Sequence, residues 1–158
     1  ICFVPDGDYV RFLREYGKVN LQPGNFVDKD GKVLGQHKGL PCYTTGQGKG
    51  LGISVGKHVY VVKKDAESNS ILLGDNEDLF TATLTATRFN WISMDTPTAP
   101  LRCTAKTRYS QVEAEATVTP LDDGRVQVQF DTPQRAITAG QAVVLYDGDV
   151  VIGGGTIE

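Results

Sequence analysis

Cysteine is scarce in this sequence, whose 158 residues include only Cys2, Cys42 and Cys103. Three is an odd number and the positions lie far apart, which argues against a framework of paired disulfides. No two of them have the short spacing that a zinc site requires, and we expect no bound metal ion. This cysteine content favours a reducing, cytoplasmic location.

Long apolar runs are also missing. A membrane-spanning helix needs about 18 consecutive apolar residues, whereas the longest uncharged apolar runs here have the length of AVVLY. The sequence also lacks an initiator methionine and any leader before Cys2, which predicts that Ile1 follows a cut within a longer polypeptide. We therefore expect a soluble, globular and monomeric fragment that has no contact with a membrane.

Acidic residues are absent from position 31 to position 64, although the net charge of the whole chain is −3. Residues 1–76 carry ten basic against eight acidic side chains, whereas residues 77–158 carry six against eleven. A second acid-free stretch, residues 96–112, contains three basic side chains. Such stretches predict a surface for a polyanion such as nucleic acid. Solvated lysines on exposed hairpins are the alternative interpretation.

The first half is predicted to hold one short helix and two hairpins. Gly17 follows a helical apolar spacing that predicts an amphipathic helix over residues 8–16. The apolar positions of that helix are Tyr9, Phe12, Leu13 and Tyr16. The stretch NFVDKDGKVLGQH predicts a hairpin that turns at Asp30-Gly31, and HVYVVKKDAESNSILLG predicts a second hairpin that turns near Ser68-Asn69.

From Leu79 onward the sequence is typical of short antiparallel strands, rich in β-branched and aromatic residues. Five or six such strands within some 80 residues predict a small closed barrel or a sandwich, because closure removes exposed strand edges. The fold class is therefore mainly β. The polar, acidic break at residues 75–78 predicts two domains, residues 1–76 and 77–158.

Between the two hairpins lies the glycine-rich stretch GQHKGLPCYTTGQGKGLG, residues 35–52. Its glycine content is incompatible with a helix interior or a plain strand and predicts a shaped loop. The stretch lacks the G-x-x-x-x-G-K-[ST] spacing of a nucleotide-binding loop, so we do not expect a nucleotide there. Contacts to an RNA backbone need only donors and room, and they fit the loop better.

Four segments together resemble one family. ICFVPDGDYVRFL, PGNFVDKDGKVLGQHKGLPCYTTGQGKGLG, AKTRYSQ and TPQRAITAGQAVVLYDGDVVIGGGTI are similar, in this order, to the bacterial tRNA-specific 2-thiouridylases of the MnmA family. The resemblance implies a three-part enzyme with an ATP-pyrophosphatase domain, a small central domain and a C-terminal barrel similar to those of translation factors. The S-G-G-x-D-S loop of the ATP domain is absent from this sequence. We therefore expect ATP to bind a missing domain and the fragment alone to be inactive.

The same resemblance implies that Cys2 carries a persulfide, charged by sulfur-carrier proteins. This sulfur would replace the 2-oxygen of the wobble uridine after ATP has adenylated that oxygen. A partner cysteine in the missing domain could then form a disulfide with Cys2 and release the product. Without the resemblance, the residues would favour the alternative interpretation of Cys2 as a small, buried apolar side chain. Cys42 and Cys103 match no catalytic position, and we interpret them as structural thiols.

The resemblance further implies contacts with tRNA, which is the expected partner. In the glycine-rich motif these residues are His37, Lys38, Tyr43, Thr44, Gln47 and Lys49. In the barrel the candidate residues are Lys106, Arg108, Tyr109, Gln134 and Arg135. Packing of the loop is the alternative for His37 and Tyr43, and strand-edge structure is the alternative for the barrel residues. Gly48 stands where the family usually has arginine, so one cationic fork is missing.

A different class of function also fits the residues. A helix-and-hairpin module followed by a translation-factor-like barrel could serve as a non-catalytic RNA-binding or protein-docking unit. The aromatic and basic residues do not discriminate between this class and the enzyme. An ATP-pyrophosphatase signature encoded upstream of Ile1 would favour the enzyme.

Overall fold

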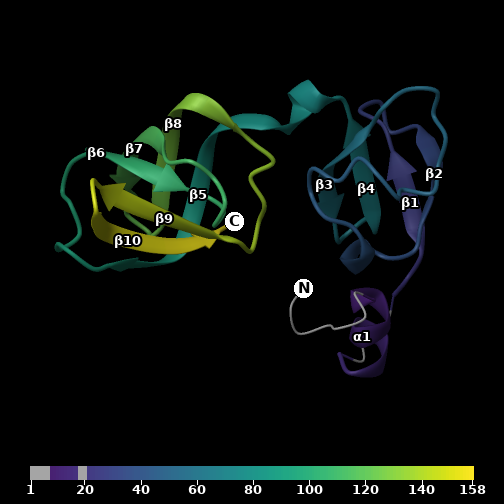
Figure 1. The fold of residues 1–158 in the computed structure, drawn as a ribbon, viewed down its shortest axis with the longest axis horizontal. Helices are drawn as coiled ribbons and strands as arrows, with labels where there is room; N and C mark the ends of the chain where they lie inside the picture. The colour runs from purple at the N-terminus through teal and green to yellow at the C-terminus, as the bar shows by residue number, and fades with distance from the viewer. Residues whose placement is uncertain (1–7, 18–20) are drawn as a thin grey trace. The chain divides into compact units, whose positions relative to one another are not determined.

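The computed structural model describes residues 8–17 and 21–158 (Figure 1). The chain divides into two units, Ile1–Leu79 and Phe80–Glu158. Each unit has its own hydrophobic core, and each is described here by itself. Within the described residues, no helix has the length and apolar character needed to cross a membrane.

The helix of the first unit is α1, Tyr9–Glu15, which confirms the helix predicted at residues 8–16. Asp8 caps it, because an Oδ1 atom of that residue accepts a hydrogen bond of 3.0 Å from the backbone N–H of Arg11. The rings of Phe12 and Tyr16 stack one turn apart, with their centroids separated by 5.1 Å. The hydroxyl of Tyr9 donates to the carbonyl of Cys42 over 2.7 Å and ties the helix to the glycine-rich loop.

Both predicted hairpins are present. The first pairs β1, Gly24–Val27, with β2, Val33–His37, and the second pairs β3, Tyr60–Asp65, with β4, Ser70–Gly74. Parallel pairing of β1 with β4 joins the hairpins into one sheet of order β2-β1-β4-β3, in which β1 and β4 run side by side (Figure 1). The sequence analysis did not predict this parallel pairing.

The core of the first unit lies on one side of this sheet and under the loop. Strand residues such as Phe26, Val61 and Ile71 have no exposed surface. Tyr43, Leu51 and Val59 join them from the segment between the hairpins. That segment begins with the short 3-10 helix η1, Leu40–Cys42, and the unit ends with a second, η2, Asn76–Leu79.

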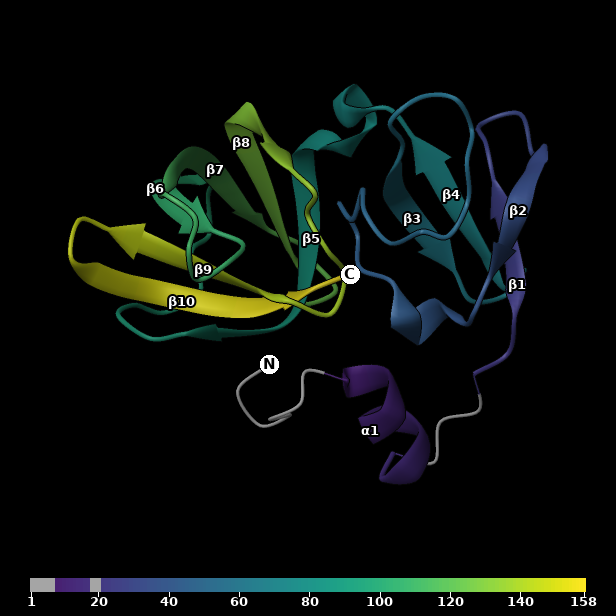
Figure 2. The ribbon, with the colours of Figure 1, turned by 45° about the vertical axis from the view of Figure 1, so that its right-hand side comes forward.

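The second unit is a closed antiparallel barrel, which resolves the predicted choice between barrel and sandwich. Around the barrel the strands follow the order β10-β5-β8-β7-β6-β9, and Figure 2 shows them closing on a common centre. The strands are β5, Phe80–Trp91; β6, Leu101–Lys106; β7, Ala114–Pro120; β8, Val126–Arg135; β9, Ala142–Asp147; and β10, Val150–Ile157.

Alternate residues of these strands point into the barrel, as the pleat requires. Ala116 and Val118 of β7 and Val128 of β8 are fully buried, while their neighbours along each strand are more exposed. Many of the inward side chains are small, which suits the limited interior of a six-stranded barrel. Cys103 belongs to this interior, as the structural interpretation of that thiol predicts.

The glycines of the VVIGGG segment allow β10 to lie close to β5, because they have no side chains. A Cβ atom on Gly155 would lie 2.8 Å from the ring of Phe89, and one on Gly153 would lie 2.5 Å from the carbonyl oxygen of Asn90. The ring of Phe89 also packs against Trp91, with centroids 4.6 Å apart. Aromatic side chains of β5 therefore fill the space that the glycine residues leave open.

Candidate nucleic-acid interface

The predicted site residues fall on both units, and the structure does not place the units relative to one another. Cys2, the predicted persulfide carrier, lies outside the described residues. The six residues predicted from the glycine-rich motif lie between the end of β2 and residue 49. The five predicted barrel residues lie on two segments, one that starts at the last residue of β6 and one at the end of β8.

Backbone pairing with β3 holds the glycine-rich loop in place. The N–H of Gly46 donates to the carbonyl of Val61 over 2.7 Å, and the N–H of Val61 donates to the carbonyl of Gln47 over 2.9 Å. Strand β3 is an edge strand of the sheet, so these bonds cover part of an edge that would otherwise be unpaired. The loop is therefore a shaped element, as predicted, rather than a free connection.

The side chains of His37 and Tyr43 are buried and support the glycine-rich loop. Their exposed fractions are 1% and 4%, and both rings contact Phe26 edge to face. Nδ1 of His37 accepts from the N–H of Gly39 over 3.0 Å, which leaves Nε2 to donate to the carbonyl of Asn69 over 3.1 Å. Tyr43 accepts from the N–H of Lys38 through its hydroxyl. Both side chains thus have the packing role that the sequence left open as the alternative.

Gln47 is a clamp within the loop. Its Oε1 atom accepts from the N–H of Thr44 over 3.0 Å, and its Nε2 atom donates to the carbonyl of Lys49 over 2.9 Å. Each end of the side-chain amide is therefore used inside the protein, and the loop bends between these two contacts. Thr44 and Lys49, in contrast, are exposed.

Four of the six lysines in the acid-free stretch fall into two groups. Lys57 pairs with Asp75 over 2.7 Å, and Lys64 donates to the carbonyl of Tyr43 over 3.1 Å. Lys38 and Lys49 are exposed, and neither ammonium group has an ion-pair partner in the described part of the chain. These two cations flank the loop and are available to an anion.

Gly48 has no space for a side chain in this structure. A Cβ atom there would lie 2.6 Å from Cε1 and 2.7 Å from Cδ1 of Tyr60, both closer than real contacts of this kind. The ring of Tyr60 thus occupies the position that an arginine side chain at residue 48 would need to leave the backbone. The glycine and the tyrosine are matched to one another.

We expect Gly48→Arg to destabilise the first unit by about 1–3 kcal/mol, because Tyr60 must move to accommodate the new side chain. Tyr60→Ala in the same chain should recover most of that loss by vacating the space. Urea denaturation of the two single variants and the double variant measures the coupling as a double-mutant cycle. Additive effects would show that residues 48 and 60 do not compete for the same space.

In the barrel, Lys106 is held by two contacts. Its Nζ atom lies 3.2 Å from a carboxylate oxygen of Glu113 and 5.5 Å from the centroid of the Tyr146 ring. The hydrogen bond from the Thr104 hydroxyl, and after it the Lys106 ammonium, lower the pKa of the Glu113 carboxyl. In contrast to Lys106, Tyr109 has a fully exposed side chain.

A polar network joins the segment after β6 to the end of β8. Arg108 donates through Nη2 to the carbonyl of Ala136. Gln111 donates to Oε1 of Gln134 over 2.5 Å, and Gln134 donates to the carbonyl of Thr132 over 2.6 Å. These contacts give Arg108 and Gln134 a structural role at the strand ends. Arg135 is exposed.

Three residues near Lys106 escaped the sequence analysis, namely Gln111, Glu113 and Tyr146. Gln111 is the last residue of the AKTRYSQ motif and Glu113 follows it closely, whereas Tyr146 reaches Lys106 from β9 through the pairing of β6 with β9. The alternating pattern of QAVVLYD indicated a strand, but a pattern of that kind does not specify which strand is its neighbour.

Neither described thiol resembles a reactive nucleophile. Burial raises the pKa of the Cys103 thiol to about 11, and burial also raises the pKa of the half-buried Cys42 thiol, although Arg14 and Lys38 oppose the shift. Since the thiolate is the reactive form, both groups are mostly unreactive near neutral pH.

We expect iodoacetamide to modify Cys103 negligibly in the folded protein at pH 8 and faster as the pH rises toward 11. The raised pKa keeps the thiol protonated in the fold, while the unfolded thiol ionises near 9.0. The same difference predicts that the barrel loses stability between those two pH values, because the unfolded state releases its proton first. Mass spectrometry of tryptic peptides measures the modification, with the urea-unfolded chain as the control. Rapid modification of Cys103 at pH 8 in the folded chain would contradict the prediction.

Comparison with known proteins defines the class of protein. A family model described as the tRNA methyl transferase PRC-barrel domain matches residues 10–75, and one described as the aminomethyltransferase beta-barrel domain matches residues 81–157. The chain thus combines a PRC-barrel domain of the tRNA methyl transferase type with a beta-barrel domain of the aminomethyltransferase type, one in each structural unit.

Individual relatives narrow this class to one family. The chain is 53% identical over all 158 residues to the tRNA-specific 2-thiouridylase MnmA of Acetivibrio thermocellus, and it covers 44% of that protein. Identity is 54% to a tRNA-specific 2-thiouridylase MnmA 1 of a Thermoanaerobacter species and 48% to the MnmA of Clostridium acetobutylicum, with 43% and 44% of those proteins covered. The chain belongs to the MnmA family and spans less than half the length of these relatives.

Proposed function

We propose that this chain is the tRNA-binding and sulfur-carrying part of an enzyme that converts the wobble uridine of tRNA into 2-thiouridine. The observation that carries the proposal is identity of about half of all residues, along the whole chain, to proteins named tRNA-specific 2-thiouridylases. The exposed lysines of the glycine-rich loop support it, because an RNA partner presents a phosphate at every nucleotide.

In this proposal the first unit supplies two components. Lys38 and Lys49 contact the phosphate backbone, while the buried His37 and Tyr43 fix the shape of the loop that presents these cations. Thr44 and Gln47 act with them, since Gln47 joins Thr44 and Lys49 through its amide. Cys2 supplies the sulfur as a persulfide that sulfur-carrier proteins have delivered.

The reaction requires that the 2-oxygen of uridine become a leaving group. ATP would supply this activation by transferring AMP to the oxygen, with the bond between its α- and β-phosphates broken and pyrophosphate released. We assign ATP binding to the part of the relatives that this chain does not cover. The terminal sulfur of the Cys2 persulfide then forms a bond to C2, and AMP departs with the oxygen. A thiol outside this chain attacks Cys2, which breaks the sulfur–sulfur bond and leaves a disulfide and 2-thiouridine.

The experiment compares this 158-residue chain with a protein of the relatives' full length that carries it. Each is incubated with unmodified tRNA, ATP and a persulfide donor, and the tRNA nucleosides are analysed by mass spectrometry. We expect 2-thiouridine from the longer protein alone and tRNA binding by both. Thiolation by the 158-residue chain, or none by the longer protein, would contradict the proposal.

A further inference from the structure

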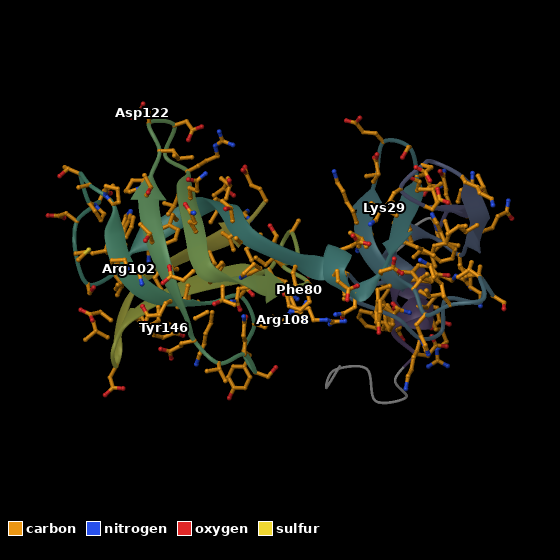
Figure 3. All side chains as sticks on the ribbon, turned by 90° about the horizontal axis from the view of Figure 1, so that it is seen from above. Lys29, Phe80, Arg102, Arg108, Asp122 and Tyr146 are labelled. Atoms are coloured by element: carbon orange, nitrogen blue, oxygen red, sulfur yellow. The ribbon has the colours of Figure 1, made fainter. Side chains whose placement is uncertain are left out.

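One end of the barrel is formed by the connections from β5 to β6, from β7 to β8 and from β9 to β10. Neighbouring strands of the barrel are antiparallel throughout, so successive connections alternate between its two ends. The barrel residues predicted to contact tRNA adjoin the other two connections and therefore the other end. Figure 3 shows Asp122, from the first end, and Arg108, from the other, at opposite edges of the barrel. We call the first end, residues 92–100, 121–125 and 147–149, the acidic end.

Apolar side chains are exposed at the acidic end. In the connection after β5, the exposed fractions of Ile92 and Met94 are 62% and 42%. At the start of β10, those of Val150 and Val151 are 53% and 36%. The backbone N–H of Ile92 donates to the carbonyl of Ile152 over 2.8 Å, so these two segments lie side by side. Exposed apolar side chains that gather in one place mark an interaction surface, whereas isolated ones are ordinary.

Carboxylates share this end with the apolar side chains. Arg125 is the one basic residue there, and its guanidinium already pairs with Asp123 over 2.6 Å and with Glu158 over 3.3 Å. The remaining four carboxylates have no ion-pair partner in the part of the chain that the structure describes. They belong to Asp95, Asp122, Asp147 and Asp149.

The segments that carry the apolar side chains offer no cation to a polyanion. Residues 89–101 and 136–158 contain no lysine or arginine, and all their ionisable side chains except tyrosine are acidic. Opposite charges favour association across an interface, and like charges oppose it. An RNA would therefore be repelled at the acidic end. A protein that presents lysine or arginine around apolar side chains would be attracted.

We propose that the acidic end of the barrel docks a protein whose contacting surface carries apolar side chains among lysine or arginine residues. The apolar side chains of both surfaces would be buried at the centre of the interface, and the carboxylates would pair with the cations of the partner at its rim. This arrangement leaves the other end of the barrel free for tRNA. The inference goes beyond the proposed function and does not depend on it, since it concerns a protein partner.

The test measures binding of the 158-residue chain to a fluorescent peptide that mimics such a surface. The peptide is an amphipathic helix with leucine on one face and lysine on the other. A second peptide has glutamate in place of lysine. Fluorescence anisotropy measures the affinity of the chain for each peptide. We expect the chain to bind the lysine peptide and to bind the glutamate peptide about tenfold or more weakly by comparison.

Ile92→Ser combined with Met94→Ser should weaken binding of the lysine peptide about 5- to 30-fold, because the centre of the interface loses its apolar contacts. Both side chains are exposed, so the barrel core stays intact. The matched control is Val33→Ser combined with Val112→Ser, which removes two exposed apolar side chains outside the acidic end. This control should bind like the parent chain. Circular dichroism confirms that each variant is folded.

Asp147→Asn combined with Asp149→Asn should weaken binding of the lysine peptide and flatten its dependence on salt, because two charge contacts are lost. Asparagine suits the turn before Gly148 as well as aspartate does, so the turn should remain. Glu67→Gln combined with Glu77→Gln is the control, since it removes two exposed carboxylates from the first unit. Its affinity and salt dependence should match those of the parent.

The inference is overturned if the variant at residues 92 and 94 binds the lysine peptide as the parent does, or if the controls weaken binding equally. Equal affinity of the parent for both peptides overturns it too. Weaker tRNA binding by the same variant would make the occupant an RNA, and a dimer that this variant abolishes in sedimentation velocity would make it a second copy; either result contradicts the proposal. None of these measurements depends on 2-thiouridine formation, by which the proposed function is judged.

Discussion

Replacing Cys2 by serine in a protein of the relatives' full length is expected to abolish 2-thiouridine formation. A hydroxyl cannot carry a persulfide, and it is a poor nucleophile at neutral pH. Binding of tRNA should survive, because serine is close to cysteine in size and the exposed lysines of the loop are unchanged. The measurements are the 2-thiouridine content by mass spectrometry and the tRNA affinity by filter binding. Loss of product with retained binding is the required pair of results.

The matched control for this variant is Cys42→Ser combined with Cys103→Ser. Both thiols are described in the structure, and burial raises the pKa of each, so neither is suited to carry the sulfur. We expect the double variant to thiolate tRNA, with some loss of stability because the Cys103 side chain lies in the barrel core. Thiolation by Cys2→Ser at the parent rate, together with failure of the control, would show that Cys2 is not the cysteine that carries the sulfur.

The sequence predicted those elements that depend on local chemistry. Asp28 shows why, because its Oδ1 atom accepts from the N–H groups of Asp30 and Lys32 and closes the turn of the first hairpin. Gly31 completes that turn at a φ of 80°, which favours glycine. The second turn uses Asn69 at a φ of 46°, which asparagine tolerates better than most residues.

Contacts between distant segments could not be predicted in the same way. The parallel pairing of β1 with β4 depends on the cores of two hairpins meeting, and no local pattern encodes it. For the site, charge placed Lys38 and Lys49 in an acid-free stretch, but residue type alone could not separate these exposed cations from Lys57, which pairs with Asp75. Likewise, a tyrosine is buried at position 43 and fully exposed at position 109.

The second large effect is expected from reversing two charges of the loop. Lys38→Glu combined with Lys49→Glu should weaken tRNA binding at low salt by about tenfold or more. It should also reduce the slope of log affinity against log salt by about two phosphate contacts. The side chains are exposed and have no ion-pair partner in the described part of the chain, so the fold should not depend on them. Filter binding over a series of salt concentrations measures both quantities.

Lys32→Glu is the control for general electrostatics. Lys32 is also exposed and belongs to the acid-free stretch, but it lies in the turn before β2, whereas Lys38 follows the other end of that strand. A five-residue strand spans about 16 Å, beyond the distance over which exposed charges interact strongly at physiological salt. Twice the loss of tRNA affinity caused by Lys32→Glu is therefore the background loss, which is expected from reversing any two exposed charges. If the loop variant weakens binding no more than that background, Lys38 and Lys49 are solvated surface residues, and the RNA contacts of the first unit lie elsewhere.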